Sequence, residues 1–342
     1  PFYLRPRLDL GLWRWCWQFF RCSNKANVEK YRQLLADLSL HSRELILAMG
    51  QELGVEIVQR GLVMHCRTQA GLAEESEVAE MARLVGVEAE VCGPERIREL
   101  DPDATMNVVG GVWFPQDCHL DPGVLMRALR DAIVSRGGQF VHADAVQFHR
   151  AGDCVHAAEV ATGETFAADQ FVLACGAWTP SMAREFNLRL PMQGGKGYSM
   201  TLENPVELPR VCSLLKEGRV AVTPMGDKLR VAGTMEICGH DLSVNKRRVE
   251  GIIKSFCEFF PAFRSAHFEG LTAWSGLRPC TPDGMPYVGS VPGVGNVLVA
   301  TGHSMLGLSL GPVTGRLVAR RLGVVDDGPD LDARKLSPGR FG

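Results

Sequence analysis

Two short segments near the end of this chain constrain its fold more than any other feature. The first, residues 274–289, reads WSGLRPCTPDGMPYVG and places Arg278 in a turn stiffened by glycine and proline. The second, residues 300–307, reads ATGHSMLG and passes from an apolar strand through glycines into a helix. The first N–H groups of a helix carry partial positive charge and lack partners within the helix. Together the segments predict an anion-binding arginine beside a ligand at a helix N-terminus.

Length, charge and cysteine usage exclude several classes of protein. At 342 residues the chain can bury a core divided between two lobes. A formal net charge of −2 argues against nucleic acid as a partner. No apolar run approaches the ~20 residues that a membrane-spanning helix needs. The eleven cysteines are scattered singly, which is typical of buried thiols in a reducing compartment and argues against a zinc site.

The N-terminal segment is both aromatic and basic. Its aromatic residues are Trp13, Trp15, Trp17, Phe19 and Phe20, and its basic residues are Arg5, Arg7, Arg14, Arg21 and Lys25. The pattern favours a helix that packs on the body of the protein. The alternative is a helix that lies on a membrane surface.

Apolar periodicity and turn residues outline the remaining elements. Helices are predicted over 28–50, 94–100, 246–260 and 306–322, and one more from the Asp121 cap and Pro122 to Gly137. Strands are predicted at 139–142, 171–175, 198–202, 220–223, 229–235 and 296–301, with a strand-turn-strand unit over 55–66. A β-meander with turns at 152–153 and 162–163 lies between the first two of these strands. The block 196–260 thus predicts an antiparallel sheet with a covering helix.

Arg278 is the strongest single candidate for a binding residue. Arginine offers two parallel N–H donors that match a carboxylate, which lysine cannot do. The alternative is a salt bridge with Asp283 in the same loop. Gly307, Gly311 and Gly315 share one helix face, and each costs up to ~1 kcal/mol relative to alanine. Close packing on a cofactor or a sheet would offset that cost; the alternative is a strand–helix corner without a ligand.

In order and spacing, these motifs resemble the flavin-dependent D-amino-acid oxidase and dehydrogenase family. The segment Lys196-Gly197-Tyr198 and the segments 191–201 and 223–236 are most similar to bacterial D-amino-acid dehydrogenases. The resemblance implies an α/β plus α+β fold, in which an antiparallel-sheet substrate lobe is inserted into an FAD-linked two-dinucleotide-binding-fold lobe. No strand-Gly-x-Gly-x-x-Gly-helix unit occurs, so we expect the chain to start after an N-terminal βαβ unit. The alternative is a complete protein without a nucleotide.

The resemblance also implies a division of the chain between the two lobes. A helical segment occupies 1–50 and a flexible tail 326–342. The substrate lobe takes 51–118 and 189–277, and the FAD-binding lobe takes 119–188 and 278–325.

Individual site residues follow from the same resemblance. Arg278 corresponds to the family's carboxylate anchor, and Tyr198, Thr223 and Met235 are candidate pocket residues, although Tyr198 and Met235 fit a core equally well. The predicted FAD contacts are Ala145, Val146, Gly176, Ala177, Trp178, Gly276, Gly302, His303, Ser304, Met305, Leu306 and Gly307.

Three of these positions carry a further expectation. His303 is expected to be structural or to lie at the flavin edge rather than to act as a base. Ala221 stands where family members often carry tyrosine, which affects substrate size and polarity. Cys280 does not align with the flavin-linked cysteine of sarcosine oxidases, so non-covalent FAD is expected.

The implied reaction is FAD-dependent oxidation of a D-amino acid to its imine, followed by hydrolysis to a 2-oxo acid. A D-proline-type substrate would stop at the cyclic imine. A quinone or an electron-transfer protein is the expected acceptor, with the enzyme cytoplasmic or peripheral on the inner face of the cytoplasmic membrane. The alternatives are an oxygen-using glycine or sarcosine oxidase, and a non-catalytic binding subunit or truncated product.

Overall fold

One large β-sheet and two three-stranded sheets organise the described part of the chain. The computed structural model describes residues 2–325 and 333–341. The larger sheet has the strand order β13-β9-β12-β11-β10-β2-β4-β3, and β1 lies beside β12. Its strands are β1 (Phe2–Leu4), β2 (Leu62–Cys66), β3 (Glu90–Cys92), β4 (Gly110–Phe114), β9 (Gln193–Leu202), β10 (Cys212–Leu215), β11 (Val220–Met225), β12 (Lys228–Ile237) and β13 (Trp274–Cys280). The pairs β1–β12 and β10–β2 are parallel, whereas β9 is antiparallel to both β12 and β13.

A smaller sheet and a meander form the other part of the molecule. The smaller sheet has the order β14-β15-β8, built from β8 (Phe171–Leu173), β14 (Tyr287–Ser290) and β15 (Val297–Thr301). The meander contains β5 (Ala145–Ala151), β6 (Cys154–Val160) and β7 (Thr165–Ala167), so both predicted turns are confirmed. As predicted, β8 is parallel to its neighbour β15. It is not fully buried, because β8 is an edge strand among the described residues and Val172 is 41% exposed.

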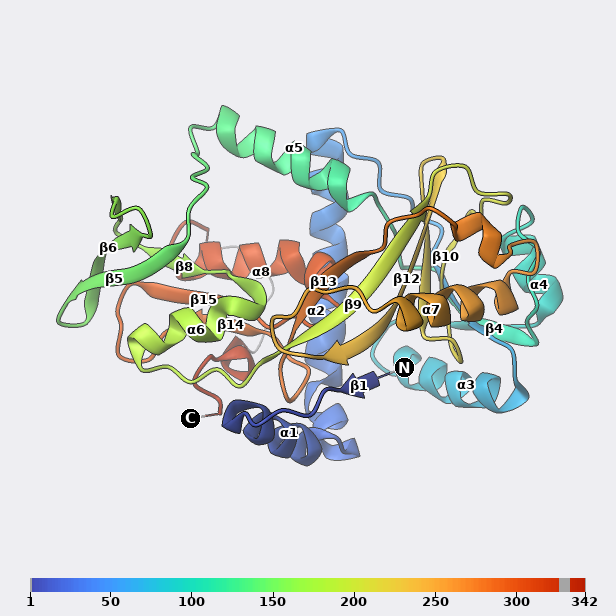
Figure 1. Ribbon diagram of the computed structural model, residues 1–342, viewed down its shortest axis with the longest axis horizontal. Helices are drawn as coiled ribbons and strands as arrows, with labels where there is room; N and C mark the ends of the chain where they lie inside the picture. The colour runs from blue at the N-terminus through green and yellow to red at the C-terminus, as the bar shows by residue number, and fades with distance from the viewer. Residues whose placement is uncertain (1, 326–332, 342) are drawn as a thin grey trace.

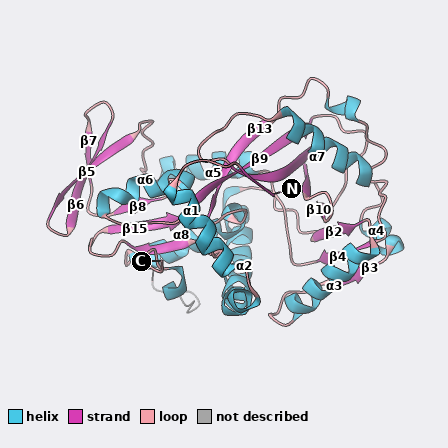
Figure 2. Ribbon diagram, turned by 60° about the horizontal axis from the view of Figure 1, so that its bottom comes forward, coloured by secondary structure: helices cyan, strands magenta, loops and turns pink. Residues whose placement is uncertain are grey.

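Helices connect the two sheets and cover them (Figures 1 and 2). The helices are α1 (Leu10–Cys22), α2 (Lys25–Leu53), α3 (Gln69–Arg83), α4 (Pro94–Leu100), α5 (Pro122–Ser135), α6 (Thr179–Ala183), α7 (Lys246–Phe259) and α8 (Gly307–Arg321). Short 3-10 turns are η1 (Gly176–Trp178), η2 (Arg184–Phe186), η3 (Ser265–Phe268) and η4 (Ala333–Leu336). Figure 1 shows α2 crossing the middle of the molecule, where Tyr31, Leu34 and Leu38 pack against residues of α8 and β14.

The helix α7 covers one face of the larger sheet. Alternate residues of the central strands, such as Val222, Leu229 and Val231, are completely buried beneath it. The rings of Phe256 and Phe260 stack with centroids 4.9 Å apart and close this core. Because side chains alternate across a strand, the remaining residues of β11 and β12 point to the opposite face, where they are half-buried. That second face is the one available for a site.

The predicted helices are all confirmed, as α2, α4, α5, α7 and α8. Helix α4 has the predicted bounds, and Asp121 caps α5 by accepting hydrogen bonds from the N–H groups of Gly123 and Val124. The strands predicted at 198–202, 220–223 and 229–235 lie within β9, β11 and β12, and that predicted at 296–301 is β15.

Other expectations are wrong. Residues 139–142 form no strand. Of the unit predicted at 55–66, the second strand is confirmed as β2, whereas within 55–61 the only strand pairing among the described residues is a single bridge between Val58 and His119. The helix α3 and the strands β3 and β4 were not predicted. Of the expected flexible tail, 326–332 lie outside the described residues, whereas 333–341 pack on the body and Leu336 is fully buried.

Candidate active site

The two C-terminal motifs meet at a junction between the sheets. Cys280, at the end of β13, forms an isolated antiparallel bridge with His303. The hydroxyl of Thr301, at the end of β15, donates to the carbonyl oxygen of Gly176 in η1 at 3.1 Å. The end of β13, the turn 302–306 and η1 therefore form one unit.

The turn before α8 leaves the N-terminus of this helix open. Gly302 has a φ of 82°, and a Cβ there would lie 2.7 Å from Cγ2 of Thr281, so the close approach requires glycine. Ser304 is also left-handed, with a φ of 50°. Helix α8 then begins at Gly307 with no side-chain cap, and Met305 is 70% exposed. The first N–H groups of α8 are available to a ligand.

His303 serves the structure of this turn. Its Nε2 lies 2.8 Å from the hydroxyl of Thr314 on α8. Burial lowers the pKa of His303 to about 4, so the ring is neutral at physiological pH. An imidazole with so low a pKa is a weak base, and its Nε2 is already bonded to its own helix, so His303 is poorly suited to take a proton from a substrate.

Arg278 is held flat across the neighbouring strand. A Cβ added at Gly197 on β9 would lie 2.1 Å from its Nη1, so glycine makes room for the guanidinium. Nη1 donates to the carbonyl oxygen of Thr234 at 3.0 Å. Thr234 sits in a bulge of β12 with a φ of 65°, an unusual conformation for a β-branched residue. Strained backbone thus orients the arginine.

The charge around Arg278 is positive. Burial lowers the pKa of its guanidinium, and the nearby charge of Arg230 lowers it further. Nη2 of Arg230 donates to the hydroxyl of Ser199 at 3.1 Å, and its Cζ lies 5.8 Å from the centroid of the Trp274 ring. Among the described residues, no carboxylate lies within ion-pair distance of either arginine. This face of the sheet can therefore receive an anion.

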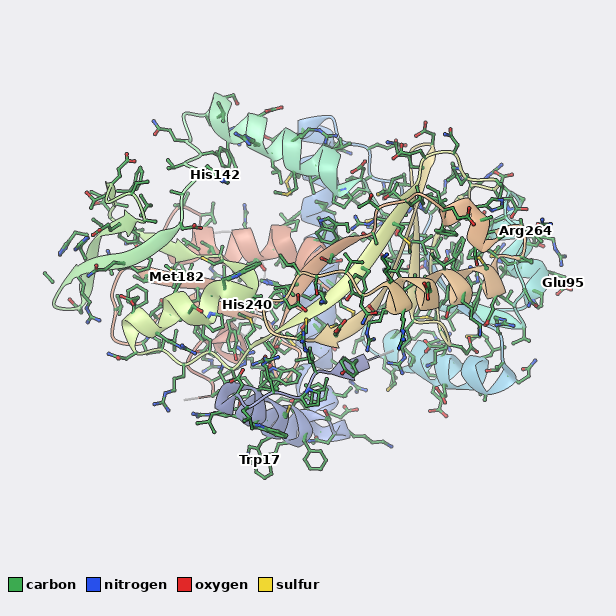
Figure 3. The ribbon with its side chains drawn as sticks, in the orientation of Figure 1. Trp17, Glu95, His142, Met182, His240 and Arg264 are labelled. Carbon is green, nitrogen blue, oxygen red and sulfur yellow. The ribbon has the colours of Figure 1, made fainter. Side chains whose placement is uncertain are left out.

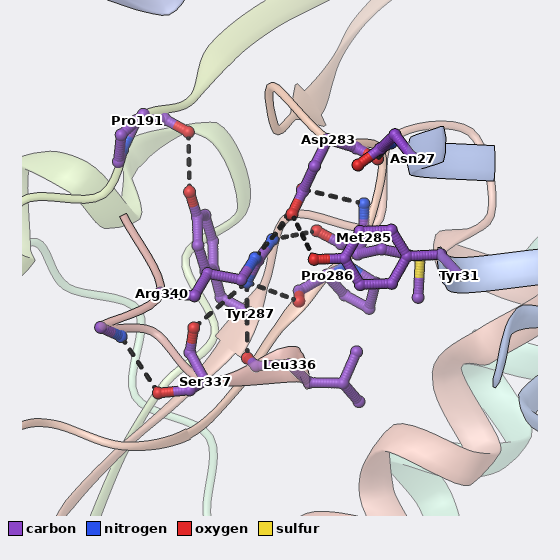
Figure 4. A network of polar contacts seen from close by, with 11 residues as sticks. Asn27, Tyr31, Pro191, Asp283, Met285, Pro286, Tyr287, Leu336, Ser337 and Arg340 are labelled. Carbon is purple, nitrogen blue, oxygen red and sulfur yellow. Dashed lines mark hydrogen bonds and ion pairs between the residues drawn. The ribbon is translucent and has the colours of Figure 1, made fainter. Parts of the chain in front are cut away.

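Asp283 does not pair with Arg278, because another arginine binds it (Figure 4). Nε and Nη2 of Arg340 donate to the two carboxylate oxygens of Asp283 at 2.8 and 2.9 Å. The Arg340 guanidinium also lies over the ring of Tyr287, 4.0 Å from its centroid. Arg340, in the C-terminal segment, thereby fixes the loop after β13. The alternative prediction, a salt bridge between Arg278 and Asp283, is wrong.

Tyr198 and Arg278 lie on opposite faces of the larger sheet. The antiparallel register pairs Gly195 with Arg278 and Gly197 with Gly276, so these residues share one face and Tyr198 points to the other. Tyr198 is 1% exposed in the core beneath α7, and its hydroxyl donates to Glu236 at 2.9 Å. The two residues are therefore not brought into one pocket.

The other two pocket candidates lie on the same face as Arg278. The sulfur of Met235 is close to Gly195, but it packs in an apolar cluster with Leu12 and Trp15 of α1. Thr223 pairs with Arg230 across β11 and β12, and Ala221 is on the same face one step further along β11. The small side chains of Ala221 and Thr223 thus lie on the same face of the sheet as Arg230 and Arg278.

The predicted cofactor contacts fall into two groups. Trp178 is 47% exposed and stacks on His240 at 5.4 Å, while Nε2 of His240 lies 3.1 Å from the carbonyl oxygen of Ala177. A Cβ on Gly276 would lie 2.2 Å from the Trp274 ring. In the meander, Ala145 begins β5 at an exposed position, and the side chain of Val146 lies outside the described residues. Leu306 is the N-cap residue of α8.

Four residues of this region were not predicted. Arg230 could have been found, because strand alternation places it on the same face as Thr223. The bulge at Thr234, the contact of His240 with η1 and the pairing of Arg340 with Asp283 leave no signal in the local sequence, since each depends on tertiary contacts.

Comparison with known proteins gives concordant matches. The family described as "FAD dependent oxidoreductase" (DAO) matches residues 12–321. A D-amino acid dehydrogenase of Methylobacterium radiotolerans is 31% identical over 349 residues, covering 100% of this chain and 82% of the relative. A D-amino acid dehydrogenase of Xanthobacter autotrophicus is also 31% identical, over 351 residues, with the same coverage.

Solved structures show the same fold. Glycine oxidase from Geobacillus kaustophilus superposes with a TM-score of 0.78 at 26% identity, covering 89% of this chain and 82% of that one. L-proline dehydrogenase from P. horikoshii superposes with a TM-score of 0.77 at 18% identity, with the same coverage. Among the helices of the described residues, none combines the length and the apolar composition of a membrane span.

Proposed function

The chain belongs to the DAO family of FAD-dependent oxidoreductases, and from that premise we propose that it oxidises D-amino acids to 2-oxo acids. The observation that carries the proposal is the placement of Arg278. Its guanidinium lies on the open face of the larger sheet without an acidic partner among the described residues, next to the junction that also holds the N-terminus of α8. The curated relatives named D-amino acid dehydrogenase support the choice of substrate class.

The residues of this junction fit the flavin end of FAD, the cofactor of the family. The uncapped N-terminus of α8 would hold its pyrimidine edge, where the helix dipole favours the negative charge of the reduced state. The buried hydroxyl of Thr281 has no hydrogen-bond partner in the described part of the chain and adds a free donor near Gly302. FAD supplies the two-electron acceptor for the reaction.

Non-covalent binding of FAD is part of the proposal. The thiol of Cys280 is 7% exposed, and burial raises its pKa. A protonated, buried thiol is a poor nucleophile, which argues against a flavin linkage at this position.

The chain's own residues mainly bind and orient the substrate. Arg278 would receive the substrate carboxylate through the N–H groups that Thr234 leaves free. The substrate ammonium loses one proton to water, and the α-hydrogen leaves with its electron pair as hydride. Water then hydrolyses the imine to a 2-oxo acid and ammonia, whereas a cyclic imine such as that of D-proline is the end product.

We further place the enzyme in the cytoplasm, with a quinone or an electron-transfer protein as its acceptor. The named relatives are dehydrogenases, which supports an acceptor other than oxygen. All eleven cysteines are free, as expected for a reducing compartment.

An anaerobic spectroscopic titration tests the proposal. The purified full-length protein should show a flavin absorption band that bleaches when D-alanine or D-proline is added, and the L-enantiomers should serve as inactive controls. A mediator dye should then be reduced in air faster than oxygen is consumed. A protein that binds no added FAD would instead support the alternative of a non-catalytic binding subunit.

A glycine- or sarcosine-type oxidase is the second candidate. The fold match to glycine oxidase at 26% identity favours it, as does the small side chain of Ala221 on the open face. Rapid oxygen consumption with glycine or sarcosine, and none with D-alanine, would select this alternative.

A further inference from the structure

The open face of the larger sheet holds a second arginine besides Arg278. Arg230 lies on β12 between Leu229 and Val231, which are both completely buried beneath α7. Because side chains alternate along a strand, Arg230 projects to the opposite, open face. Among the residues that the structure describes, no carboxylate forms an ion pair with its guanidinium. The described part of the chain therefore leaves this positive charge without a counter-ion.

Arg230 is held beside β9, close to the position of Arg278. Its Nη2 donates to the hydroxyl of Ser199 at 3.1 Å, and its Cζ lies 5.8 Å from the ring centroid of Trp274. Ser199 is two residues from Gly197, over which the Arg278 guanidinium lies. Since a strand rises ~3.3 Å per residue, the two guanidinium groups lie over points roughly 7 Å apart along β9. Burial lowers the pKa of Arg278, and the nearby charge of Arg230 lowers it further.

The two arginines lie at different distances from the junction that is proposed to hold the flavin. Figure 3 shows His240, which contacts η1, between the larger and the smaller sheet. Strand β9 begins at this end of the larger sheet. Its Gly195 pairs with Arg278, whereas Thr201, six residues further on, pairs with Arg230. Arg230 therefore lies on the side to which a substrate side chain would extend from the flavin.

Small side chains lie beside Arg230 on this face. Its neighbour on β12 is Ala232, which pairs with Ala221 of β11, and both alanines are only half-buried. On the other side, the ring of Trp274 leans over Gly276 of its own strand, where a Cβ would lie 2.2 Å from it. A ligand on this face is therefore free to extend over the two alanines towards Arg230.

Two guanidinium groups without acidic partners match a ligand with two acidic groups. Like charges held close together destabilise each other, and two carboxylates on one ligand would neutralise both. Each guanidinium can bind a carboxylate through two parallel hydrogen bonds. The carboxyl carbons of aspartate and glutamate are roughly 4–5 Å apart, given C–C bonds of about 1.5 Å. A ligand of this length can reach both arginines.

We propose that Arg230 binds the side-chain carboxylate of a dicarboxylic D-amino acid such as D-glutamate or D-aspartate. This inference rests on the proposed function, in which Arg278 holds the α-carboxylate. The second carboxylate takes no part in the redox step, so the product is a dicarboxylic 2-oxo acid. Arg230 thereby selects acidic substrates over neutral substrates of the same size.

Steady-state kinetics on the full-length protein with FAD test this selectivity. Wild type should show a kcat/KM for D-glutamate at least about tenfold above that for D-glutamine, which has nearly the same shape but no side-chain charge. In Arg230→Gln the ratio of these two values should fall by about tenfold or more. Arg230→Lys keeps the charge without the planar fork and should retain part of the preference.

Lys228→Gln is the matched control. Lys228 lies on the same face of β12, two residues from Arg230, but its ammonium is paired with Glu203. Its replacement should leave the ratio of D-glutamate to D-glutamine unchanged, which separates Arg230 from a general effect of positive charge on this face. The proposal is overturned if wild type shows no preference for D-glutamate, or if Arg230→Gln lowers kcat/KM equally for D-glutamate, D-glutamine and D-alanine. An equal loss would mean that Arg230 serves the α-carboxylate or the sheet itself.

Calorimetric titration with glutarate separates this proposal from the proposed function. Glutarate has two carboxylates and no amino group, so it binds without being oxidised, and butyrate is its analogue with one carboxylate. Glutarate should bind wild type at least about tenfold more tightly than butyrate, and Arg230→Gln should remove that difference. If D-alanine bleaches the flavin band but glutarate binds no better than butyrate, the proposed function stands and the role of Arg230 is refuted. If no D-amino acid bleaches the band, the proposed function fails, and Arg230-dependent binding of glutarate would still support a site for two carboxylates.

Discussion

Replacing Arg278 with lysine is the sharpest test of the proposed substrate site. The guanidinium lies over Gly197, and its Nη1 is already used by the carbonyl oxygen of Thr234. In the proposed site, the remaining N–H groups would face the substrate carboxylate in a fixed orientation. Lysine keeps the positive charge but has no planar fork, so it cannot hold both Thr234 and a carboxylate in the same geometry.

The size of the effect follows from the hydrogen bonds that are lost. A hydrogen bond to a charged group contributes ~1.5–3 kcal/mol. Lysine in place of Arg278 loses one such bond to the carboxylate, and every 1.4 kcal/mol corresponds to about tenfold. We therefore expect kcat/KM to fall by about 10- to 150-fold, mostly through a higher KM, because the carboxylate does not change during the reaction.

Steady-state kinetics with a mediator dye would measure this, with Arg98→Lys on α4 as the matched control. The flavin band and its intensity should be unchanged in Arg278→Lys, since the substitution is aimed at the substrate rather than at FAD. A KM within about twofold of wild type would refute the assignment of Arg278 as the carboxylate anchor, whatever the substrate proves to be.

Further predictions concern the same region and the core. Gly197→Ala should raise KM with little loss of flavin, because its Cβ would occupy the position of the Arg278 guanidinium; substrate titrations would show this. Asp283→Asn should lower the free energy of unfolding by ~3–5 kcal/mol in urea denaturation, because Arg340 would keep a buried, unpaired charge; an effect below ~1 kcal/mol would contradict this reasoning. Burial lowers the pKa of His65 to about 4, so its neutral form is favoured in the folded state. The unfolded state therefore takes up a proton first, and the free energy of unfolding should fall as the pH drops from ~6.5 towards 4. In His65→Leu this pH dependence should be smaller by ~3 kcal/mol, as measured by denaturation at several pH values.

Much of the fold could be predicted because local patterns agree with the tertiary structure. Helix α5 has a proline and an aspartate cap at its start, and β11 alternates cleanly between two environments, as does β12 up to its bulge. Helix α3 was missed because its apolar positions are few: Gly71 and Ala79 are among its buried residues, and neither gives a strong periodic signal. The strand predicted at 139–142 failed because Phe140 and Val141 are both exposed, and no strand pairs with them in the described residues.

For the site, sequence could predict which segments meet but not how the side chains within them point. Tyr198 was grouped with Arg278 through the family resemblance, yet a register that pairs Gly197 with Gly276 puts it on the other side of the sheet. The pairing of Arg340 with Asp283 joins positions 57 residues apart, and nothing in either segment specifies the other. The face on which a side chain lies and the partner that it binds are determined by tertiary packing rather than by the local sequence.

The placement of α1 has a consequence for the order in which the chain can fold during synthesis. Trp15 rests on Cys280, 265 residues further along, and β1 pairs with residues 235–237 of β12. At typical translation rates of ~5–20 residues per second, that partner appears roughly 10–50 s after the helix itself. Throughout this interval the face of α1 that carries Leu12 and Trp15 lacks its native contacts, so the nascent chain exposes an apolar, positively charged helix until the sheet that covers this face has been made.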